Sequence, residues 1–205
     1  RQVYIDLIDY TISKGKAVIV LIPEIALTYQ TVMRFTRRFG DRVSIINSRL
    51  SKGERYDQFE RAKNGDVDIM IGPRSALFTP FKNLGLIIID EEHESAYKSE
   101  SVPKYHATEV AIKRAKDVGA TLVLGSATPS VESYYRAKNG AYKLHVLNKR
   151  EKGNLPEVHV VDLREELKNE NKSIFSIELQ NLIKDRLEKK QQIMLFINRR
   201  GYAGF

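Results

Sequence analysis

The sequence predicts an α/β fold in which a mainly parallel β-sheet is covered by helices on both faces. Five aliphatic segments alternate with helical segments, an order typical of parallel strands joined by helical crossovers. The four consecutive aliphatic residues at 86–89 indicate a central strand that is buried on both faces. The predicted strands are residues 17–22, 43–46, 67–71, 86–89 and 121–124.

Apolar spacing and end signals predict the helices between those strands. Apolar residues recur at helical spacing in the first twelve residues, and a second apolar stripe stops at Gly40. Ser51 and Glu54 form a Ser-x-x-Glu capping box that opens a helix ending at Gly65. The predicted helices are residues 1–12, 27–40, 51–65, 107–117 and 129–140.

We expect three parts along the chain. A first unit covers residues 1–148, a linker covers 149–156, and a second unit begins at 157 and runs to 205. The linker is rich in charged residues and contains Gly and Pro. Two strands and one helix are too few to fold well alone, so we expect the second unit to be the beginning of a larger one. Its predicted elements are a strand at 158–161, a helix at 176–190 and a strand at 193–197.

The composition indicates a soluble protein with a basic surface. The 34 Lys and Arg residues exceed the 26 Asp and Glu residues, and the net charge of +8 is compatible with a polyanionic partner. Much of the excess lies between Arg34 and Lys63, where a solvated helical face is the alternative explanation. The absence of cysteine excludes disulfides and thiolate metal sites. Apolar runs are too short for a membrane span, so we expect a cytoplasmic location and no membrane partner.

An acidic cluster follows the predicted central strand. Asp90, Glu91, Glu92 and His93 come directly after it, at the edge of an α/β sheet where ligands bind. An aliphatic strand running into Asp-Glu is the Walker B pattern, in which the aspartate holds Mg²⁺ through water and the glutamate orients or deprotonates the attacking water. We therefore predict these four residues as catalytic, with Asp90 for magnesium, Glu91 for water and His93 for coupling to neighbouring motifs. The alternative is a strand that exits into a solvated acidic turn.

Polar signatures also follow three other predicted strands. They are Pro23-Glu24-Ile25-Ala26-Leu27-Thr28, Gly72-Pro73-Arg74-Ser75-Ala76-Leu77-Phe78 and Gly125-Ser126-Ala127-Thr128-Pro129. In order and spacing, these signatures and the acidic cluster resemble motifs Ia, Ib, III and II of superfamily 2 helicases. The individual residues of these motifs resemble those of the PriA-type replication-restart helicases. The run Asn198-Arg199-Arg200-Gly201-Tyr202 is similar to that family's motif at the start of the second motor lobe.

This resemblance implies a RecA-like P-loop NTPase motor lobe followed by the start of a second RecA-like lobe. It also implies an ATP-dependent DNA helicase that moves 3′ to 5′, restarts stalled replication forks and initiates primosome assembly. ATP and Mg²⁺ are the implied cofactors, and the family's Zn²⁺ is bound by cysteines that this sequence lacks. The implied partners are single-stranded and forked DNA, single-stranded-DNA-binding protein and helicase-loading proteins. We expect the chain itself to be monomeric.

The resemblance assigns roles to the remaining signatures. Ser126, Ala127 and Thr128 are expected to couple the nucleotide site to DNA, with helix capping by Thr128 as the alternative. The second-lobe motif is expected at Asn198, Arg199 and Arg200. The predicted DNA contacts are Pro23, Glu24, Gly72, Arg74, Ser75, Tyr97, Lys98, Tyr105 and His106.

Alternatives remain open for several of these DNA contacts. Aromatic and basic side chains are interleaved in the polar loop between 94 and 106, which suits base stacking combined with phosphate attraction. For Tyr97 and Tyr105 the alternative is packing at the edge of the core. For Arg74 the alternative is a surface salt bridge.

The sequence departs from the family pattern at the phosphate-binding motif. Gly-x-x-x-x-Gly-Lys-Ser/Thr is absent, because Gly15-Lys16 is followed by Ala17 where a hydroxyl is needed. We therefore expect that these 205 residues do not hydrolyse ATP by themselves. Two smaller departures are Asn47 in place of His and Tyr29 in place of Pro. Two other interpretations stay open: another superfamily 2 DNA translocase, or a non-catalytic nucleic-acid-binding module.

Overall fold

The structure, a computed structural model, describes residues 2–147 and 156–196. The chain divides into two compact units, Arg1–His145 and Val146–Phe205. The predicted linker at 149–156 lies outside the described residues except for Pro156. The division into a first motor lobe, a linker and the start of a second lobe therefore stays a prediction.

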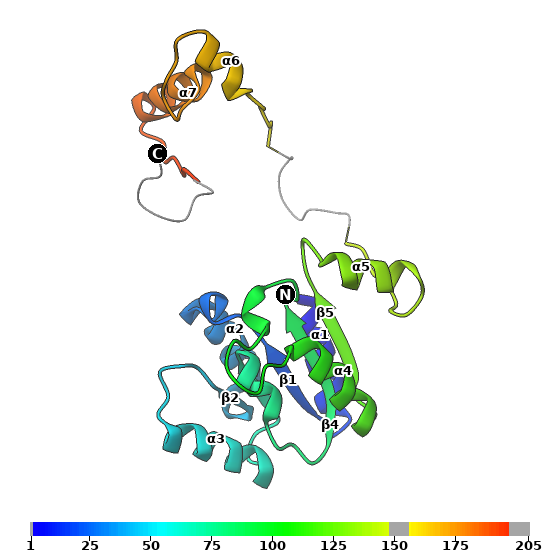
Figure 1. Cartoon of the computed structure of the whole chain (residues 1–205). Helices are drawn as coiled ribbons and strands as arrows, with labels where there is room; N and C mark the ends of the chain where they lie inside the picture. Colours follow the sequence, from blue (N-terminus) through cyan, green and yellow to red (C-terminus); the bar gives the residue numbers. More distant parts are fainter. Residues whose placement is uncertain (1, 148–155, 197–205) are drawn as a thin grey trace. The chain divides into compact units, whose positions relative to one another are not determined.

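The first unit is built on a five-stranded sheet with the strand order β2-β3-β1-β4-β5 (Figure 1). Every neighbouring pair of strands runs parallel, as the alternation of strands and helices predicts. The strands are β1 (Ala17–Leu21), β2 (Val43–Ile45), β3 (Ile69–Gly72), β4 (Leu84–Asp90) and β5 (Thr121–Gly125). The predicted α/β fold class is confirmed.

Strand β4 lies between β1 and β5, as a central strand should. The aliphatic run from Leu86 to Ile89 is buried, because strands flank both of its edges and helices cover both faces. The register sets Leu21 beside Ile89 and Asp90 beside Gly125. The carboxyl ends of β1, β4 and β5 therefore meet at one edge of the sheet, where the acidic cluster begins.

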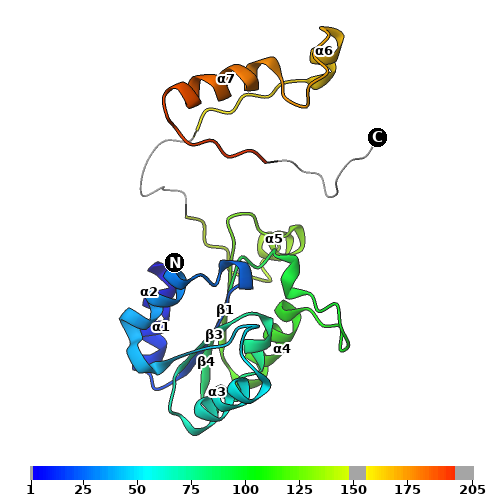
Figure 2. The ribbon, with the colours of Figure 1, turned by 90° about the vertical axis from the view of Figure 1, so that its left-hand side faces the viewer.

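Helices cover the two faces of the sheet (Figure 2). One face is covered by α1 and α2 through side chains such as Ile8 and Phe35, and the other by α3 and α4 through Ala62 and Ala111. Fully burying an Ile or Phe side chain contributes about 1.5–3 kcal/mol, so both layers stabilise the sheet. In residues 2–147 and 156–196, no helix has the length and apolar character needed to cross a bilayer. The helices of this unit are α1 (Gln2–Ser13), α2 (Tyr29–Phe39), α3 (Lys52–Asn64), α4 (Ala107–Val118) and α5 (Val131–Lys138).

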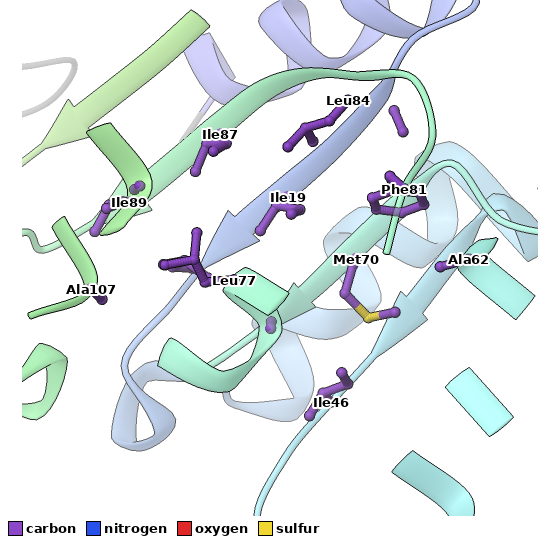
Figure 3. Close-up of a cluster of buried hydrophobic side chains, with 14 of the residues drawn as sticks. Ile19, Ile46, Ala62, Met70, Leu77, Phe81, Leu84, Ile87, Ile89 and Ala107 are labelled. Atoms are coloured by element: carbon purple, nitrogen blue, oxygen red, sulfur yellow. The ribbon is translucent and has the colours of Figure 1, made fainter. Parts of the chain in front are cut away.

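The core on the α3 and α4 face extends beneath the loop that follows β3 (Figure 3). Leu77 is fully buried in the same cluster as Ile19 of β1 and Ile87 of β4. Because Leu77 is anchored, the polar residues just before it are held at the carboxyl end of β3. Leu77 belongs to one of four short 3₁₀ helices in the described connections: η1 (Glu24–Ala26), η2 (Gly40–Arg42), η3 (Arg74–Phe78) and η4 (Ser95–Tyr97).

The predicted helix caps hold for α3 but not for α5. The capping box at the start of α3 is confirmed, with both of its hydrogen bonds present. At α5 the cap is Ser130, whose hydroxyl accepts a hydrogen bond from the backbone N–H of Ser133. The alternative role of Thr128 as helix cap is wrong, because the hydroxyl of Ser126 accepts the N–H of Thr128 in a turn ahead of the helix.

The described part of the second unit, residues 156–196, contains α6 (Leu163–Lys168) and α7 (Ile177–Glu188). The helix α7 confirms the one predicted at 176–190. The strands predicted at 158–161 and 193–197 are wrong as far as residue 196, since neither segment forms regular structure there. Val160 is 92% exposed. A strand needs a neighbour to accept and donate its backbone hydrogen bonds, and residues 156–196 supply none.

Candidate active site

Two carboxylates with different environments stand at the end of β4. Asp90, its last residue, is 8% exposed, and its Oδ1 accepts a hydrogen bond from the hydroxyl of Tyr4 at 3.0 Å. Glu91 follows with its side chain 38% exposed. Its φ of 50° is in the left-handed region, which costs a non-glycine residue about 1–3 kcal/mol. A strained residue that bears an accessible carboxylate beside a buried one is typical of a functional turn.

His93 joins the acidic cluster to the turn after β5. Its Nδ1 lies 2.7 Å from the hydroxyl of Ser126, and its Nε2 lies 3.4 Å from the hydroxyl of Thr128. The same Nδ1 is 3.8 Å from Oε2 of Glu91. The structure therefore brings together the residues that the sequence predicts for coupling, with Ala127 between the two hydroxyl residues. What they couple stays a prediction.

Glu92 has a structural role at the start of α5, and its predicted catalytic role stays a prediction. The side chain is buried at 5% exposure, and its carboxylate accepts hydrogen bonds from the backbone N–H of Ser130, the hydroxyl of Ser130 and the hydroxyl of Ser133. Its own N–H donates to the carbonyl of Gly125. A carboxylate at the amino-terminal end of a helix also favours the helix dipole. Glu92 thus holds the start of α5 through both of its carboxylate oxygens.

Removing the Glu92 carboxylate is expected to destabilise the fold. Glu92→Ala leaves three donors at the start of α5 without their acceptor, so we expect the free energy of unfolding to fall by about 2 kcal/mol. The control is Glu132→Ala, which removes an exposed carboxylate from the first turn of the same helix and should cost under about 1 kcal/mol. Urea unfolding followed by circular dichroism measures both values. Equal losses would contradict the anchoring role.

Tyr4 of α1 is a site residue that the sequence pattern does not indicate. It lies among the apolar positions of a predicted helix, yet its hydroxyl reaches Asp90. Gly125 makes room for it: a Cβ at Gly125 would overlap the Tyr4 hydroxyl and lie 2.9 Å from the ring carbon Cζ. The sequence gives only a general indication of this role, because a partly buried tyrosine hydroxyl usually has a hydrogen-bond partner. Which partner it has depends on the packing of α1 against β4.

The loops after β1 and β3 are held by contacts with the segment that follows β2. Oε1 of Glu24 accepts the N–H of Ser48 at 2.6 Å, and this hydrogen bonding, helped by the charge of Arg49, lowers the pKa of Glu24. At Gly72, a Cβ would lie 2.7 Å from the carbonyl oxygen of Ile46. Glycine is therefore required at that position for the close approach of two backbones.

Arg74 clamps the backbone of the loop that follows the acidic cluster. Its Nη1 donates hydrogen bonds to the carbonyl oxygens of Ala96 and Lys98, each at 2.9 Å. The partners are backbone carbonyls, so the alternative of a surface salt bridge does not describe this side chain. Hydrogen bonds from a charged guanidinium are stronger than neutral ones. The loop after β3 is thus fixed to the loop after β4.

Tyr97 belongs to the core, so its predicted role in base stacking is wrong. The residue is 1% exposed, and its hydroxyl lies 2.6 Å from the carbonyl oxygen of Asp90 and 3.1 Å from that of Leu21. Burial, together with the nearby charge of Asp90, raises the pKa of this hydroxyl, which stays a neutral donor. A ring without an exposed face cannot lie against a DNA base. The alternative of packing in the core is the correct one.

The other predicted DNA contacts of this loop differ in exposure. Lys98 is exposed and available to a phosphate. Tyr105 is half-buried and meets the ring of Phe78 edge-on, with centroids 5.4 Å apart. His106 caps α4 by accepting the N–H of Thr108 at its Nδ1. DNA contact by these residues stays a prediction, and Lys98 is the least constrained of them.

The predicted site also includes Pro23, Ser75 and the second-lobe motif. Pro23 is buried directly after β1, and Ser75 is half-buried in η3, so both lie in the loops where the sequence predicts them. The second-lobe motif lies outside the described residues. Its members are Asn198, Arg199 and Arg200.

The donor atoms at the carboxyl edge fit a magnesium ion shared with a nucleotide. Among the described residues, no group of three or more His, Cys, Asp or Glu side chains is placed to hold a metal ion. Mg²⁺ usually takes only one or two protein carboxylates and completes its shell with water and substrate phosphates. Asp90, whose carboxylate is already oriented by Tyr4, suits that role. The arrangement does not suit a metal site made of protein ligands alone.

Comparison with known proteins supports the helicase family that the sequence motifs indicate. The family model of the DEAD/DEAH box helicases matches residues 3–137. The replication restart protein PriA of Bacillus subtilis is 51% identical over 100% of this chain and 26% of its own length. PriA of Synechocystis is 46% identical over 100% of this chain and 25% of its own. The chain thus spans about a quarter of the length of these curated relatives, and the predicted resemblance to PriA-type helicases is confirmed.

A solved structure supports the fold. The helicase domain of Pyrococcus furiosus Hef matches with a TM-score of 0.50 and 18% identity, over 70% of this chain and 31% of that one. At that identity the likeness shows the fold alone, and it agrees with the predicted RecA-like lobe. On its sequence motifs and the matched family model, the chain belongs to the DEAD/DEAH box helicase family.

Proposed function

We propose that the chain is part of an ATP-dependent DNA helicase that moves 3′ to 5′, restarts stalled replication forks and initiates primosome assembly. The observation that carries the proposal is the acidic cluster at the end of β4, where Asp90 and Glu91 stand beside His93 and the turn it binds. Family membership and the names of the relatives support it. Paired carboxylates at this edge of a sheet suit phosphoryl transfer to water.

In the proposed reaction each residue of the cluster has one task. Asp90 would hold Mg²⁺, which would supply positive charge next to the transferred phosphoryl group. The Tyr4 hydroxyl keeps the Asp90 carboxylate oriented for that role. Glu91, whose side chain is accessible, orients the attacking water and takes its proton at a carboxylate oxygen. Glu92 supports the start of α5.

His93 is the proposed link between hydrolysis and the turn after β5. Its ring lies between the Glu91 carboxylate and the hydroxyls of Ser126 and Thr128. A change in the hydrogen bonding of Glu91 during hydrolysis alters the hydrogen bond between Nδ1 of His93 and the hydroxyl of Ser126. Ser126, Ala127 and Thr128 then pass that change to α5, which begins at the next turn.

The proposed DNA site lies in the loops after β1, β3 and β4. Lys98 and Arg74 suit phosphate contacts, which position a strand without reading its sequence. The net charge of +8 favours a polyanion. The remaining residues of the proposed interface are Pro23, Glu24, Gly72, Ser75, Tyr105 and His106.

The finer parts of the proposal concern the full-length protein. Its proposed cofactors are ATP and Mg²⁺, with Zn²⁺ bound by cysteines outside these 205 residues. Its proposed partners are single-stranded and forked DNA, single-stranded-DNA-binding protein and helicase-loading proteins. We place it in the cytoplasm, associated with the nucleoid during replication. The second-lobe motif is proposed to include Asn198, Arg199 and Arg200, and these 205 residues alone are proposed to be a monomer without ATPase activity.

Strand separation by the full-length protein tests the proposal. The substrates are a duplex with a 3′ single-stranded tail, a duplex with a 5′ tail and a forked duplex, each with ATP and Mg²⁺. We expect unwinding of the 3′-tailed and forked duplexes and none of the 5′-tailed one. Unwinding from the 5′ tail would overturn the polarity. Hydrolysis without strand separation would favour another translocase, and DNA binding without hydrolysis would favour a binding module.

A further inference from the structure

We propose that Tyr29, at the end of the loop after β1, is a stacking residue for a base of single-stranded DNA. This inference rests on the proposed function, which assigns the loops after β1, β3 and β4 to DNA and describes contacts with its phosphates. The inference adds a contact with a base. Tyr29 stands where the helicase pattern has Pro, so this contact belongs to the chain and not to the pattern.

The Tyr29 side chain contributes little to the fold. It is the first residue of α2, and it is 77% exposed. The aromatic residues of α2 that do pack, Phe35 and Phe39, are buried against the sheet. A ring that stays in water gains little stability from burial, so packing does not account for an aromatic residue at this position.

The backbone that presents the Tyr29 ring is fixed. The hydroxyl of Thr28 accepts the N–H of Thr31 and caps α2. The N–H of Leu27 donates to the carbonyl of Glu24, and the Leu27 side chain packs against the core on the α1 and α2 face. A ring on a rigid backbone has little freedom to lose when a ligand stacks on it, which favours binding.

A second apolar side chain of the same loop is also turned outward. Ile25 of η1 is 88% exposed, whereas its neighbours Ala26 and Leu27 pack against the core. The loop therefore presents an aliphatic and an aromatic side chain at the carboxyl edge of the sheet. Exposed apolar groups gathered in one loop are typical of a binding surface, and a flat aromatic base suits such a surface.

Positive charge near the loop favours a nucleic acid as its occupant. Hydrogen bonds from Ser48 lower the pKa of Glu24. The charges of Arg49 and Arg55 lower it further, so both guanidinium groups lie close to this loop. Proteins hold single-stranded nucleic acid by combining cations, which attract the phosphates, with aromatic rings, on which the bases stack. This loop and its neighbours supply both kinds of group.

Tyr29→Pro removes the ring and is expected to keep the fold. The first residue of a helix has no use for its N–H within the helix, and Pro is favoured there. Thr28, the residue before it, already has the extended backbone that a following Pro requires, with φ −75° and ψ 161°. We therefore expect a thermal unfolding midpoint equal to or above that of the wild type. Tyr29→Ala, which also removes the ring, replaces this variant if it does not fold.

DNA binding by the full-length protein tests the inference. The probes are a single-stranded oligonucleotide and an abasic strand of the same length, which keeps the phosphates and lacks the bases. Fluorescence anisotropy measures the Kd of each. Tyr29→Pro is expected to raise the Kd for the first probe about fivefold or more, the effect of one stacked base, and the Kd for the abasic strand less than about twofold. The salt dependence of the Kd should not change, because the ring carries no charge.

Two further variants control this experiment. Tyr29→Phe keeps the ring and should bind both probes as the wild type does. Tyr10→Ala removes another exposed tyrosine, which is 66% exposed on α1. Because α1 ends just before β1 begins, Tyr10 lies toward the amino edge of the sheet, away from the loops that follow the strands. Its removal should leave both Kd values unchanged.

Three results would contradict stacking by Tyr29. An unchanged Kd in Tyr29→Pro would show that the ring does not contact DNA, and a lower unfolding midpoint with it would show that the ring packs on another part of the full-length protein. Equal losses on the two probes would place the contact on the DNA backbone. A loss in Tyr29→Phe as large as that in Tyr29→Pro would place it at the hydroxyl. Each of these leaves the proposed function intact, whereas a wild type that binds no DNA would overturn the proposed function itself.

Discussion

Glu91→Gln in the full-length protein is expected to lower kcat for ATP hydrolysis by about 10²–10⁴-fold, the usual contribution of a positioned general base. The amide keeps the size of the side chain but cannot take a proton from water. DNA binding and the unfolding midpoint should be close to those of the wild type, because the Glu91 side chain is accessible and the backbone turn is retained. Steady-state hydrolysis and thermal unfolding measure the two quantities. Hydrolysis within tenfold of the wild type would contradict the role of Glu91.

Glu91→Gly provides the matched test that the residue is kept for function and not for folding. Glycine adopts a φ of 50° at little cost, so we expect this variant to unfold with a free energy about 1 kcal/mol higher than the wild type. Its hydrolysis should be as low as that of Glu91→Gln. Such a gain in stability with a loss of activity is the expected sign of strain stored at a catalytic turn. A less stable Glu91→Gly protein would show that the carboxylate supports the fold.

Gly125→Ala is expected to lower the free energy of unfolding by about 3 kcal/mol, the upper part of the usual range for overpacking. The added methyl group would overlap the Tyr4 hydroxyl and crowd the ring carbon behind it. Tyr4 must then leave its place beside Asp90, so the oriented carboxylate is lost together with the packing. Urea unfolding measures the stability, and calorimetric titration with Mg²⁺ and a non-hydrolysable ATP analogue measures the nucleotide site in the full-length protein.

Two variants control the Gly125 experiment. Gly53→Ala adds a methyl group where nothing lies within 4 Å and should raise stability by about 0.5 kcal/mol, because alanine favours a helix. Tyr4→Phe removes the overlapping oxygen, so the double variant Tyr4→Phe with Gly125→Ala should recover part of the lost stability. Additive losses in the double variant would show that the two residues do not share this contact.

The architecture of the first unit is predictable because its signals are local. A short aliphatic run such as 86–89, bounded by Gly85 and by acidic residues, is typical of a strand covered on both faces. The helix end signals at Gly40 and Gly65 are also local, because each depends on one turn of the chain. A parallel sheet then brings the polar residues after its strands to one edge. That geometry is why His93, after β4, lies within hydrogen-bond distance of Ser126, after β5.

The roles of individual polar residues depend on tertiary partners that a sequence pattern does not specify. Glu91 and Glu92 are neighbours of the same type, yet one is accessible and the other is buried beneath the start of α5. Tyr97 stands in a polar stretch that suits base stacking, yet its hydroxyl reaches backbone carbonyls of β1 and β4 inside the core. Tyr4 shows the reverse, a site residue inside an apolar helix pattern. Burial of a polar side chain follows from register and packing.

The strands predicted at 158–161 and 193–197 show a second limit. Their apolar residues match a strand, but a strand is stable only as part of a sheet. In the described residues of the second unit, the elements are α6 and α7. The pattern indicates what a segment is suited to form, and residues 156–196 contain no neighbouring strand with which either segment could pair.

The rate of ATP hydrolysis by the full-length protein, with and without single-stranded DNA, tests the central claim most directly. The account predicts hydrolysis that rises on addition of DNA and disappears in Glu91→Gln. These outcomes would place the acidic cluster at the end of β4 in a DNA-driven motor. A folded protein that binds DNA and shows no hydrolysis, or one whose hydrolysis survives Glu91→Gln, would contradict it.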